Sequence, residues 1–187
     1  IISEEAARHD FLATSGKLTS MEKKQFQEIQ NYRMDKDTLI YSLRDLSRFL
    51  EKHSGKKVIV LIDEYDVPLA KASENGYYNE MVRLIRNLFE NALKTNDSLK
   101  FSVLTGCLRV AKESIFTGLN NFNVYSITDA DFDEYFGFTD HEVKEILHYY
   151  GLDDHYDTVR QWYDGYRFGN VDVYCPWDVI NYCSDNL

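Results

Sequence analysis

Hydrophobic residues in the first third of the chain recur at helical spacing, and this pattern predicts helices over residues 3–52. The last of these helices has the clearest apolar stripe, which consists of Leu39, Leu43, Leu46 and Leu50. Either Asp35 or Asp37 would cap its start, and Gly55 would end it. The first quarter of the chain is therefore expected to contain no strand.

Two helix starts carry the same capping signature. Thr19 is followed three positions later by Glu22, and Thr139 is followed in the same way by Glu142. In a capping box the hydroxyl and the carboxylate each accept a hydrogen bond from a backbone N–H group that would otherwise lack a partner. A helix is therefore expected after each threonine, and Gly151 would end the second one.

The hydrophobic period changes at residues 58–62, where VIVLI forms a short continuous run of mostly β-branched residues. Such a run without polar alternation is typical of a strand buried on both faces of a parallel sheet. An amphipathic helix is expected over residues 77–95, a second strand over residues 101–104 and a third strand over residues 123–127. Strands alternating with helices indicate an α/β fold.

The pattern after Asp129 is helical, which divides the chain into two predicted parts. Residues 1–128 would form an incomplete three-layer core around a parallel sheet. Residues 129–187 would form a helical, lid-like appendage with no further sheet. An aromatic group within the appendage either packs it onto the sheet or forms a surface for bases or a peptide; its members are Trp162, Tyr163, Tyr166, Phe168, Tyr174 and Trp177.

Composition narrows the classes of function. The formal net charge of −10 does not favour nucleic-acid binding by the overall electrostatic field. The chain has three cysteines and no CxxC pair, which fits a reducing, cytoplasmic compartment. Neither a run of apolar residues long enough to span a membrane nor a signal peptide is visible. Because residue 1 is Ile, the chain is expected to be a piece of a longer protein.

The end of the first predicted strand carries the candidate chemistry. Asp63 and Glu64 follow the buried run directly, and this is the arrangement of a Walker B strand. Asp63 would hold Mg²⁺ through water, and Glu64 would polarise the water that attacks the γ-phosphate. Asp66 would be a hydrogen-bond acceptor that supports these two residues in the nucleotide site without touching the nucleotide itself. Alternatively, it would only cap the loop. The alternative is an acidic, solvent-exposed turn after a core strand.

The second predicted strand ends at Thr105, beside the first in a doubly wound sheet. A polar residue at this position can sense the γ-phosphate, and Arg109 could supply positive charge there. The alternative is that Thr105 caps the next helix and that Arg109 is solvated.

The phosphate-binding loop of a P-loop ATPase is not found in this sequence. The pattern GxxxxGK[ST] is matched neither at Gly16-Lys17 nor at Gly55-Lys56. Moreover, Gly55 precedes the buried strand, whereas a phosphate loop follows one. Either the loop lies upstream of Ile1, or the chain is a degenerate relative that serves as a non-catalytic module for binding protein or nucleic acid.

Four sequence blocks resemble the predicted AAA-ATPase-like family. They are residues 55–66 (GKKVIVLIDEYD), 105–121 (TGCLRVAKESIFTGLNN), 135–139 (YFGFT) and 162–169 (WYDGYRFG). The resemblance implies a P-loop NTPase core whose phosphate loop precedes this chain, with ATP and Mg²⁺ as ligands. It also implies, in many members, a restriction-endonuclease-like domain through which nucleic acid would be bound. A core piece with an unpaired strand edge is expected to self-associate or to bind a protein partner.

Overall fold

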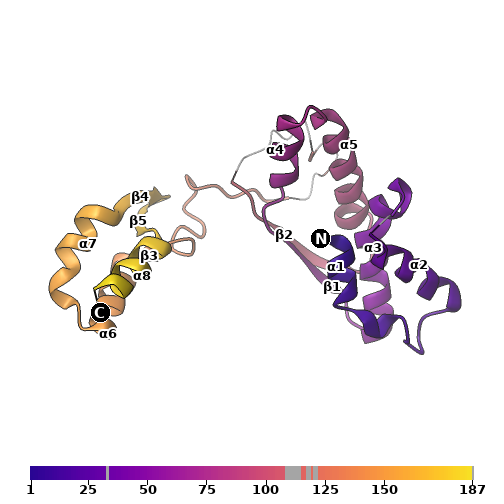
Figure 1. The fold of residues 1–187 in the computed structure, drawn as a ribbon, viewed down its shortest axis with the longest axis horizontal. Coiled ribbons are helices and arrows are strands. Elements are labelled where there is room, and N and C mark those ends of the chain that lie inside the picture. Colours follow the sequence, from indigo (N-terminus) through magenta and orange to yellow (C-terminus); the bar gives the residue numbers. More distant parts are fainter. Residues whose placement is uncertain (33, 108–114, 117–118, 120–121, 187) are drawn as a thin grey trace. The chain divides into compact units, whose positions relative to one another are not determined.

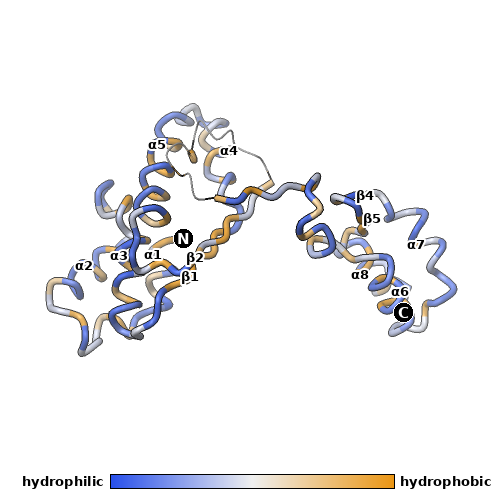
Figure 2. Tube along the Cα trace, turned by 180° about the vertical axis from the view of Figure 1, so that it is seen from behind, coloured by the Kyte–Doolittle hydropathy of each residue, from blue (hydrophilic) through white to orange (hydrophobic). Residues whose placement is uncertain are grey.

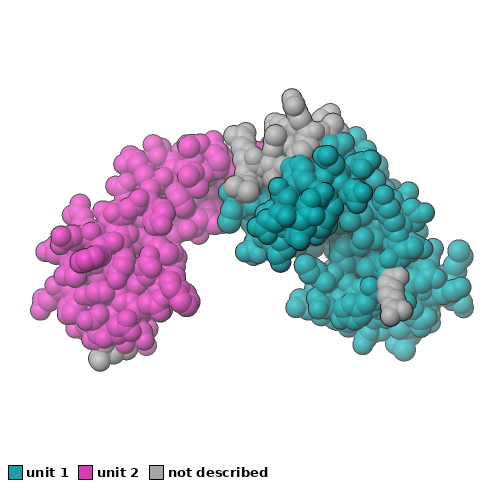
Figure 3. All heavy atoms as spheres, turned by 45° about the horizontal axis from the view of Figure 1, so that its top comes forward, with its two compact units in different colours: residues 1–122 teal, residues 123–187 magenta. Residues whose placement is uncertain are grey.

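A computed structural model describes residues 1–32, 34–107, 115–116, 119 and 122–186 of the chain. The chain divides into two compact units, residues 1–122 and 123–187, which are coloured separately in Figure 3. The boundary therefore falls a few residues before the predicted one, which lay after residue 128. Each unit is described by itself below.

The first unit begins with helices, as the hydrophobic spacing predicts (Figure 1). Their bounds are α1 Ile2–Ala7, the 3₁₀ turn η1 Asp10–Leu12, α2 Ser20–Gln30 and α3 Lys36–Ser54. The capping box at Thr19 and Glu22 is confirmed. Asp35, not Asp37, caps α3, because its side chain accepts a hydrogen bond from the Thr38 N–H group, and Gly55 ends the helix with a φ of 76°.

Two predicted strands pair in parallel in the first unit. β1 (Val58–Ile62) lies beside β2 (Leu99–Leu104), with Ile59 opposite Phe101 and Leu61 opposite Val103. The connection between them contains α4 (Val67–Glu74), α5 (Tyr78–Phe89) and a π-helical turn, η2 (Glu90–Lys94). This strand, helix, strand order confirms the mixed α/β class, whereas a complete three-layer core is not observed among the described residues.

The prediction that β1 is buried on both faces is wrong. Val60 and Ile62 pack against a core formed largely by α4, α5 and η2. Ile59 and Leu61 point to the other face and remain 45% and 73% exposed. No described element covers that face, although Figure 2 shows hydrophobic colours along much of the two strands. An uninterrupted apolar run does not distinguish a covered face from an open one, because both have the same composition.

The second unit contains the predicted helices and also a small sheet. The helical elements are α6 (Asp140–Tyr150), the 3₁₀ turn η3 (Asp153–His155), α7 (Tyr156–Tyr163) and α8 (Pro176–Asp185). The capping box at Thr139 and Glu142 and the end at Gly151 are confirmed. Strands β3 (Phe138–Thr139), β5 (Val171–Tyr174) and β4 (Asp164–Phe168) form an antiparallel sheet in that order.

Two predictions for this region are wrong. Residues 123–126 have no regular secondary structure, so the expected third strand is absent there. Residues 129–187 contain a sheet and not helices alone. β4 (DGYRF) is short and largely exposed, and β5 (VDVY) has only four residues, so neither strand is long enough for apolar alternation to give a clear signal. The two-residue connection Gly169-Asn170 is a hairpin turn signature that could have revealed them.

Candidate functional site

The carboxyl ends of β1 and β2 bring two of the predicted site residues into direct contact. The Thr105 hydroxyl donates a hydrogen bond to Asp63 Oδ1. The parallel ladder continues past both strands, because Thr105 N donates to Ile62 O at 2.9 Å and Tyr65 N donates to Thr105 O at 3.0 Å. Backbone pairing of the strands therefore fixes the position of both side chains at one edge of the sheet.

Asp63 keeps one carboxylate oxygen available for a ligand. Its Oδ1 accepts hydrogen bonds from the Thr105 hydroxyl and, at 3.0 Å, from the Glu64 N–H group. No described residue donates a hydrogen bond to Oδ2 or forms an ion pair with Asp63 or Glu64. Both acidic residues are solvent-exposed. Neither Asp63 nor Glu64 is therefore engaged in a structural salt bridge with a described residue.

Glu64 occupies a backbone conformation that residues other than glycine rarely adopt. Its φ is 52°, in the left-handed region, where a residue other than glycine costs roughly 1–2 kcal/mol. The chain turns here from β1 toward α4, and Val67 N donates a hydrogen bond to Glu64 O at 3.1 Å. Such strained residues are concentrated at functional sites, so the conformation supports a role for Glu64.

Asp66 follows Asp63 and Glu64 in the chain and is only 5% exposed. Its backbone carbonyl begins α4 by accepting hydrogen bonds from the N–H groups of Leu69 and Ala70, whereas its side chain makes no cap hydrogen bond with that helix. A Cβ atom added to Gly106 would lie 2.7 Å from Asp66 Oδ1 and 2.8 Å from Tyr65 Cε1. Gly106 thus permits the chain after β2 to approach the Asp66 carboxylate, a role that the sequence pattern did not reveal.

The donor set at this edge fits Mg²⁺. The described residues contain no group of three His, Cys, Asp or Glu side chains arranged to hold a metal. Mg²⁺ in nucleotide sites, however, is commonly held by one or two carboxylates, with water and phosphate oxygens completing its shell. Asp63 with its available oxygen and the neighbouring Thr105 hydroxyl match that chemistry. Arg109, the remaining predicted site residue, lies outside the described residues.

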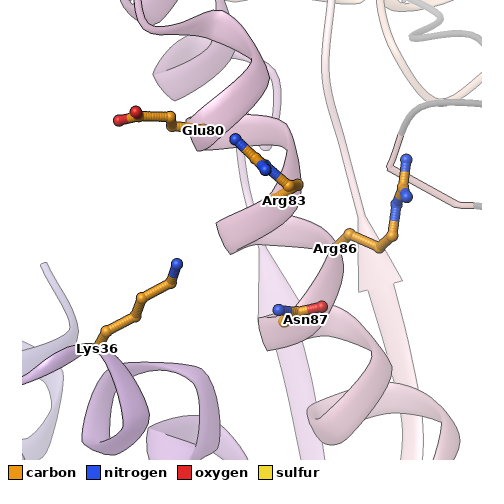
Figure 4. Close-up of a pocket in the computed structure, with 5 residues that line it drawn as sticks. All are labelled: Lys36, Glu80, Arg83, Arg86 and Asn87. Atoms are coloured by element: carbon orange, nitrogen blue, oxygen red, sulfur yellow. The ribbon is translucent and has the colours of Figure 1, made fainter.

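A separate depression of about 560 Å³ lies on the first unit (Figure 4). It is lined by Lys36, Glu80, Arg83, Arg86 and Asn87. Figure 4 shows that these side chains do not converge: the Arg86 guanidinium points away from Lys36. None of the predicted site residues lines it. We therefore place the candidate site at the ends of the strands and not in this depression.

The aromatic group predicted for the second unit is divided between core and surface. Tyr174 is fully buried and Tyr163 packs against the same core. Trp162, Tyr166 and Trp177 are exposed, so the group does not act as a single packing element. No described helix is both long and apolar enough to cross a membrane.

These observations define an α/β protein with acidic and hydroxyl side chains at the carboxyl ends of two parallel strands. Residues 4–116 match the family described as Predicted AAA-ATPase, and the chain belongs to that family. The matched residues include β1, β2 and the candidate site. The blocks at residues 135–139 and 162–169 lie outside the match.

The chain is also similar to a curated protein named "Uncharacterized protein in vnfD 5'region" from Azotobacter chroococcum mcd 1. The two are 33% identical over 142 residues, which is 73% of this chain and 26% of that protein. The chain thus spans about a quarter of the length of this relative. No solved structure matches the chain.

Proposed function

We propose that this chain supplies the Mg²⁺-positioning and water-activating strand of a P-loop ATPase. The observation that carries the proposal is the contact between Asp63 and Thr105 at the ends of adjacent parallel strands. In open α/β sheets, ligands bind outside the carboxyl ends of the strands. Membership of a family predicted to consist of ATPases supports the same reaction class.

Each residue has a distinct proposed role. Bound Mg²⁺ would neutralise charge on the β- and γ-phosphates of ATP. Asp63 would hold a water of the metal shell through its available carboxylate oxygen. Glu64, exposed at the turn after β1, accepts a proton from the attacking water. Thr105 orients Asp63 and would sense the γ-phosphate, and Arg109, which lies outside the described residues, would supply positive charge to the site.

Asp66 is proposed to act indirectly. Its burial keeps it from direct contact with solvent-borne ligands, but its carboxylate lies against Gly106. It would therefore support the position of the backbone that follows Thr105. The phosphate loop itself would come from elsewhere in a longer polypeptide, because neither Gly16-Lys17 nor Gly55-Lys56 has the required sequence. In the structure, Gly55 instead terminates α3 ahead of β1.

The test compares Glu64→Gln with the wild-type protein in the longer polypeptide that contains this chain. Nucleotide binding is measured by calorimetry with Mg-ATP, and turnover by release of phosphate. We expect the substitution to preserve binding and to lower turnover by about 100-fold or more, because a positioned general base contributes roughly that factor.

The matched control is Glu74→Gln, which changes an exposed glutamate at the end of α4 in the same unit. It is expected to leave both binding and turnover unchanged. If turnover in Glu64→Gln equals that of the wild type, Glu64 is not the base. If neither protein binds Mg-ATP, the proposed ATPase role fails, and the alternative of a non-catalytic module for binding protein or nucleic acid is favoured.

A further inference from the structure

The second unit exposes a cluster of aromatic rings on the segment that leads into its sheet. The rings of Tyr125 and Phe132 are 5.0 Å apart between centroids, and those of Phe132 and Tyr135 are 6.2 Å apart. These three side chains are 49%, 53% and 77% exposed. Contiguous exposed apolar surface of this kind marks interaction sites more often than isolated exposed residues do. We call these three residues the aromatic cluster.

The segment that carries the cluster is held in place by the β4–β5 hairpin. Gly169 N donates a hydrogen bond to Ile127 O at 2.8 Å, and Asn170 N donates one to Asp133 Oδ2 at 3.0 Å. The contact at Gly169 is so close that an added Cβ atom would lie 2.5 Å from Asp129 O. The cluster is therefore presented on a fixed backbone, which reduces the entropy lost when a partner binds.

The surroundings of the cluster are strongly acidic. Residues 123–187 contain 14 Asp and Glu residues and three Lys and Arg residues, which gives a formal charge of −11. Each of the three cations is paired with an aspartate; the pairs are Lys144–Asp140, Arg160–Asp164 and Arg167–Asp172. Asp131 and Glu134, which lie within the aromatic segment, are exposed and have no ion-pair partner among the described residues. The second unit thus carries a large uncompensated negative charge.

We propose that the aromatic cluster, with Asp131 and Glu134, is a docking surface for an arginine- or lysine-containing segment of a protein partner. Cationic side chains stack on the faces of tyrosine and phenylalanine, and the carboxylates of Asp131 and Glu134, which adjoin Phe132 and Tyr135 in the sequence, complement their charge. Nucleic acid is disfavoured, because its phosphates would be repelled by this unit. A second copy of the same unit is disfavoured for the same electrostatic reason. The proposal does not depend on ATP hydrolysis.

The test uses the whole 187-residue chain and a fluorescent peptide of about ten residues in which arginine and glycine alternate. Binding is measured by fluorescence anisotropy at several salt concentrations. We expect saturable binding that Tyr135→Ala weakens by about threefold, the loss typical of one exposed cation–π contact. The double substitution Asp131→Asn, Glu134→Gln is expected to weaken binding and to reduce its dependence on salt.

Matched controls separate this surface from a general effect of charge. Tyr149→Ala removes an equally exposed tyrosine on α6, and Asp154→Asn with Asp157→Asn removes two exposed carboxylates of the same unit. If these controls weaken binding as much as the cluster variants, the surface is not specific and the proposal fails. It also fails if a glutamate–glycine peptide or single-stranded oligothymidylate binds as tightly as the arginine peptide. Concentration-dependent dimerisation that Tyr135→Ala abolishes would instead identify a second copy as the occupant.

Discussion

At the scale of single residues, the candidate site depends on two unusual backbone positions. Glu64 has a left-handed conformation that places its side chain at the turn after β1. Gly106 allows the chain after β2 to pass within van der Waals reach of Asp66. Together with the hydrogen bond from Thr105 to Asp63, these positions determine the geometry of the site more directly than any apolar contact does.

Gly106→Ala tests the close approach between the two strand ends. The added methyl group would overlap the buried Asp66 carboxylate and the Tyr65 ring, so we expect the free energy of unfolding to fall by about 1–3 kcal/mol. Urea unfolding followed by circular dichroism measures the change. Gly16→Ala is the control, because an added Cβ atom there has no neighbour within 4 Å. Equal stability of the two variants would show that the chain relaxes around Gly106 without cost.

At the scale of elements, an ion pair joins the start of α2 to α3. Lys52 Nζ lies 2.6 Å from Glu22 Oε2, and the backbone N–H of Thr19 donates to the same oxygen at 2.7 Å. The hydrogen bond from Lys52, followed by that from Thr19, lowers the pKa of Glu22 from 4.5 to about 2. A lowered pKa in the folded state means that the ionised form contributes stability above pH 4.5, and that this contribution is lost as the pH falls toward 2.

Glu22→Gln is therefore expected to reduce the free energy of unfolding by about 1 kcal/mol at pH 7. The difference from the wild type should shrink as the pH falls from about 4.5 to 2. Urea titrations at several pH values measure it. Glu28→Gln, an exposed position on the same helix, should have little effect at any pH. If the difference in the free energy of unfolding stays constant down to pH 2, ionisation of the Glu22 carboxylate is not its source.

The open face of the β1–β2 sheet leads to a prediction about association. Ile59, Leu61, Phe101 and Val103 are all exposed on this face, and among the described residues the two strands pair only with each other. Unpaired edges and contiguous apolar surface promote association. We expect the isolated chain to self-associate with increasing concentration and Leu61→Lys to weaken this association by about tenfold or more. Sedimentation velocity measures it.

Met21→Lys is the control for that experiment, because it introduces the same charge at an exposed apolar residue of α2. It should leave the association constant unchanged. A chain that stays monomeric at high concentration would contradict the prediction that the open face promotes association.

At the scale of the whole molecule, the two units have separate cores. In the second unit, residues of α6, α7, β5 and α8 form one buried cluster that includes Val143, Leu147, Val159 and Tyr174. The hydrogen bonds from the Tyr156 and Tyr174 hydroxyls to Asp140 add a polar contact within the same unit. A self-contained core of this kind is what an independently folding domain requires.

We therefore expect residues 123–187 to fold when expressed alone. Thermal unfolding followed by circular dichroism should be cooperative, with a modest melting temperature because the core is small. Val159→Asp would place an unpaired charge in the core and should abolish the transition. A gradual, non-cooperative melt of the unsubstituted unit would contradict the expectation.

Local chemistry allowed the sequence alone to predict several helix ends, although it left Asp35 and Asp37 as alternative caps of α3 and did not predict α4. The ends at Thr19, Gly55, Thr139 and Gly151 were predictable because these residues act on backbone groups within a few residues of themselves. The run at residues 58–62 and the acidic residues after it also identified a strand and a candidate site. The family match includes this region.

Only the tertiary structure decided which surfaces meet. Pairing of β1 with β2 joined Thr105 to Asp63 across 42 positions of sequence, and one-sided packing left Leu61 exposed. The antiparallel sheet of the second unit and the aromatic cluster held by Gly169 likewise depend on contacts between distant segments. The physical reason is that strand pairing and burial of a face are set by the partner segment, whereas a helix cap is set by its immediate neighbours.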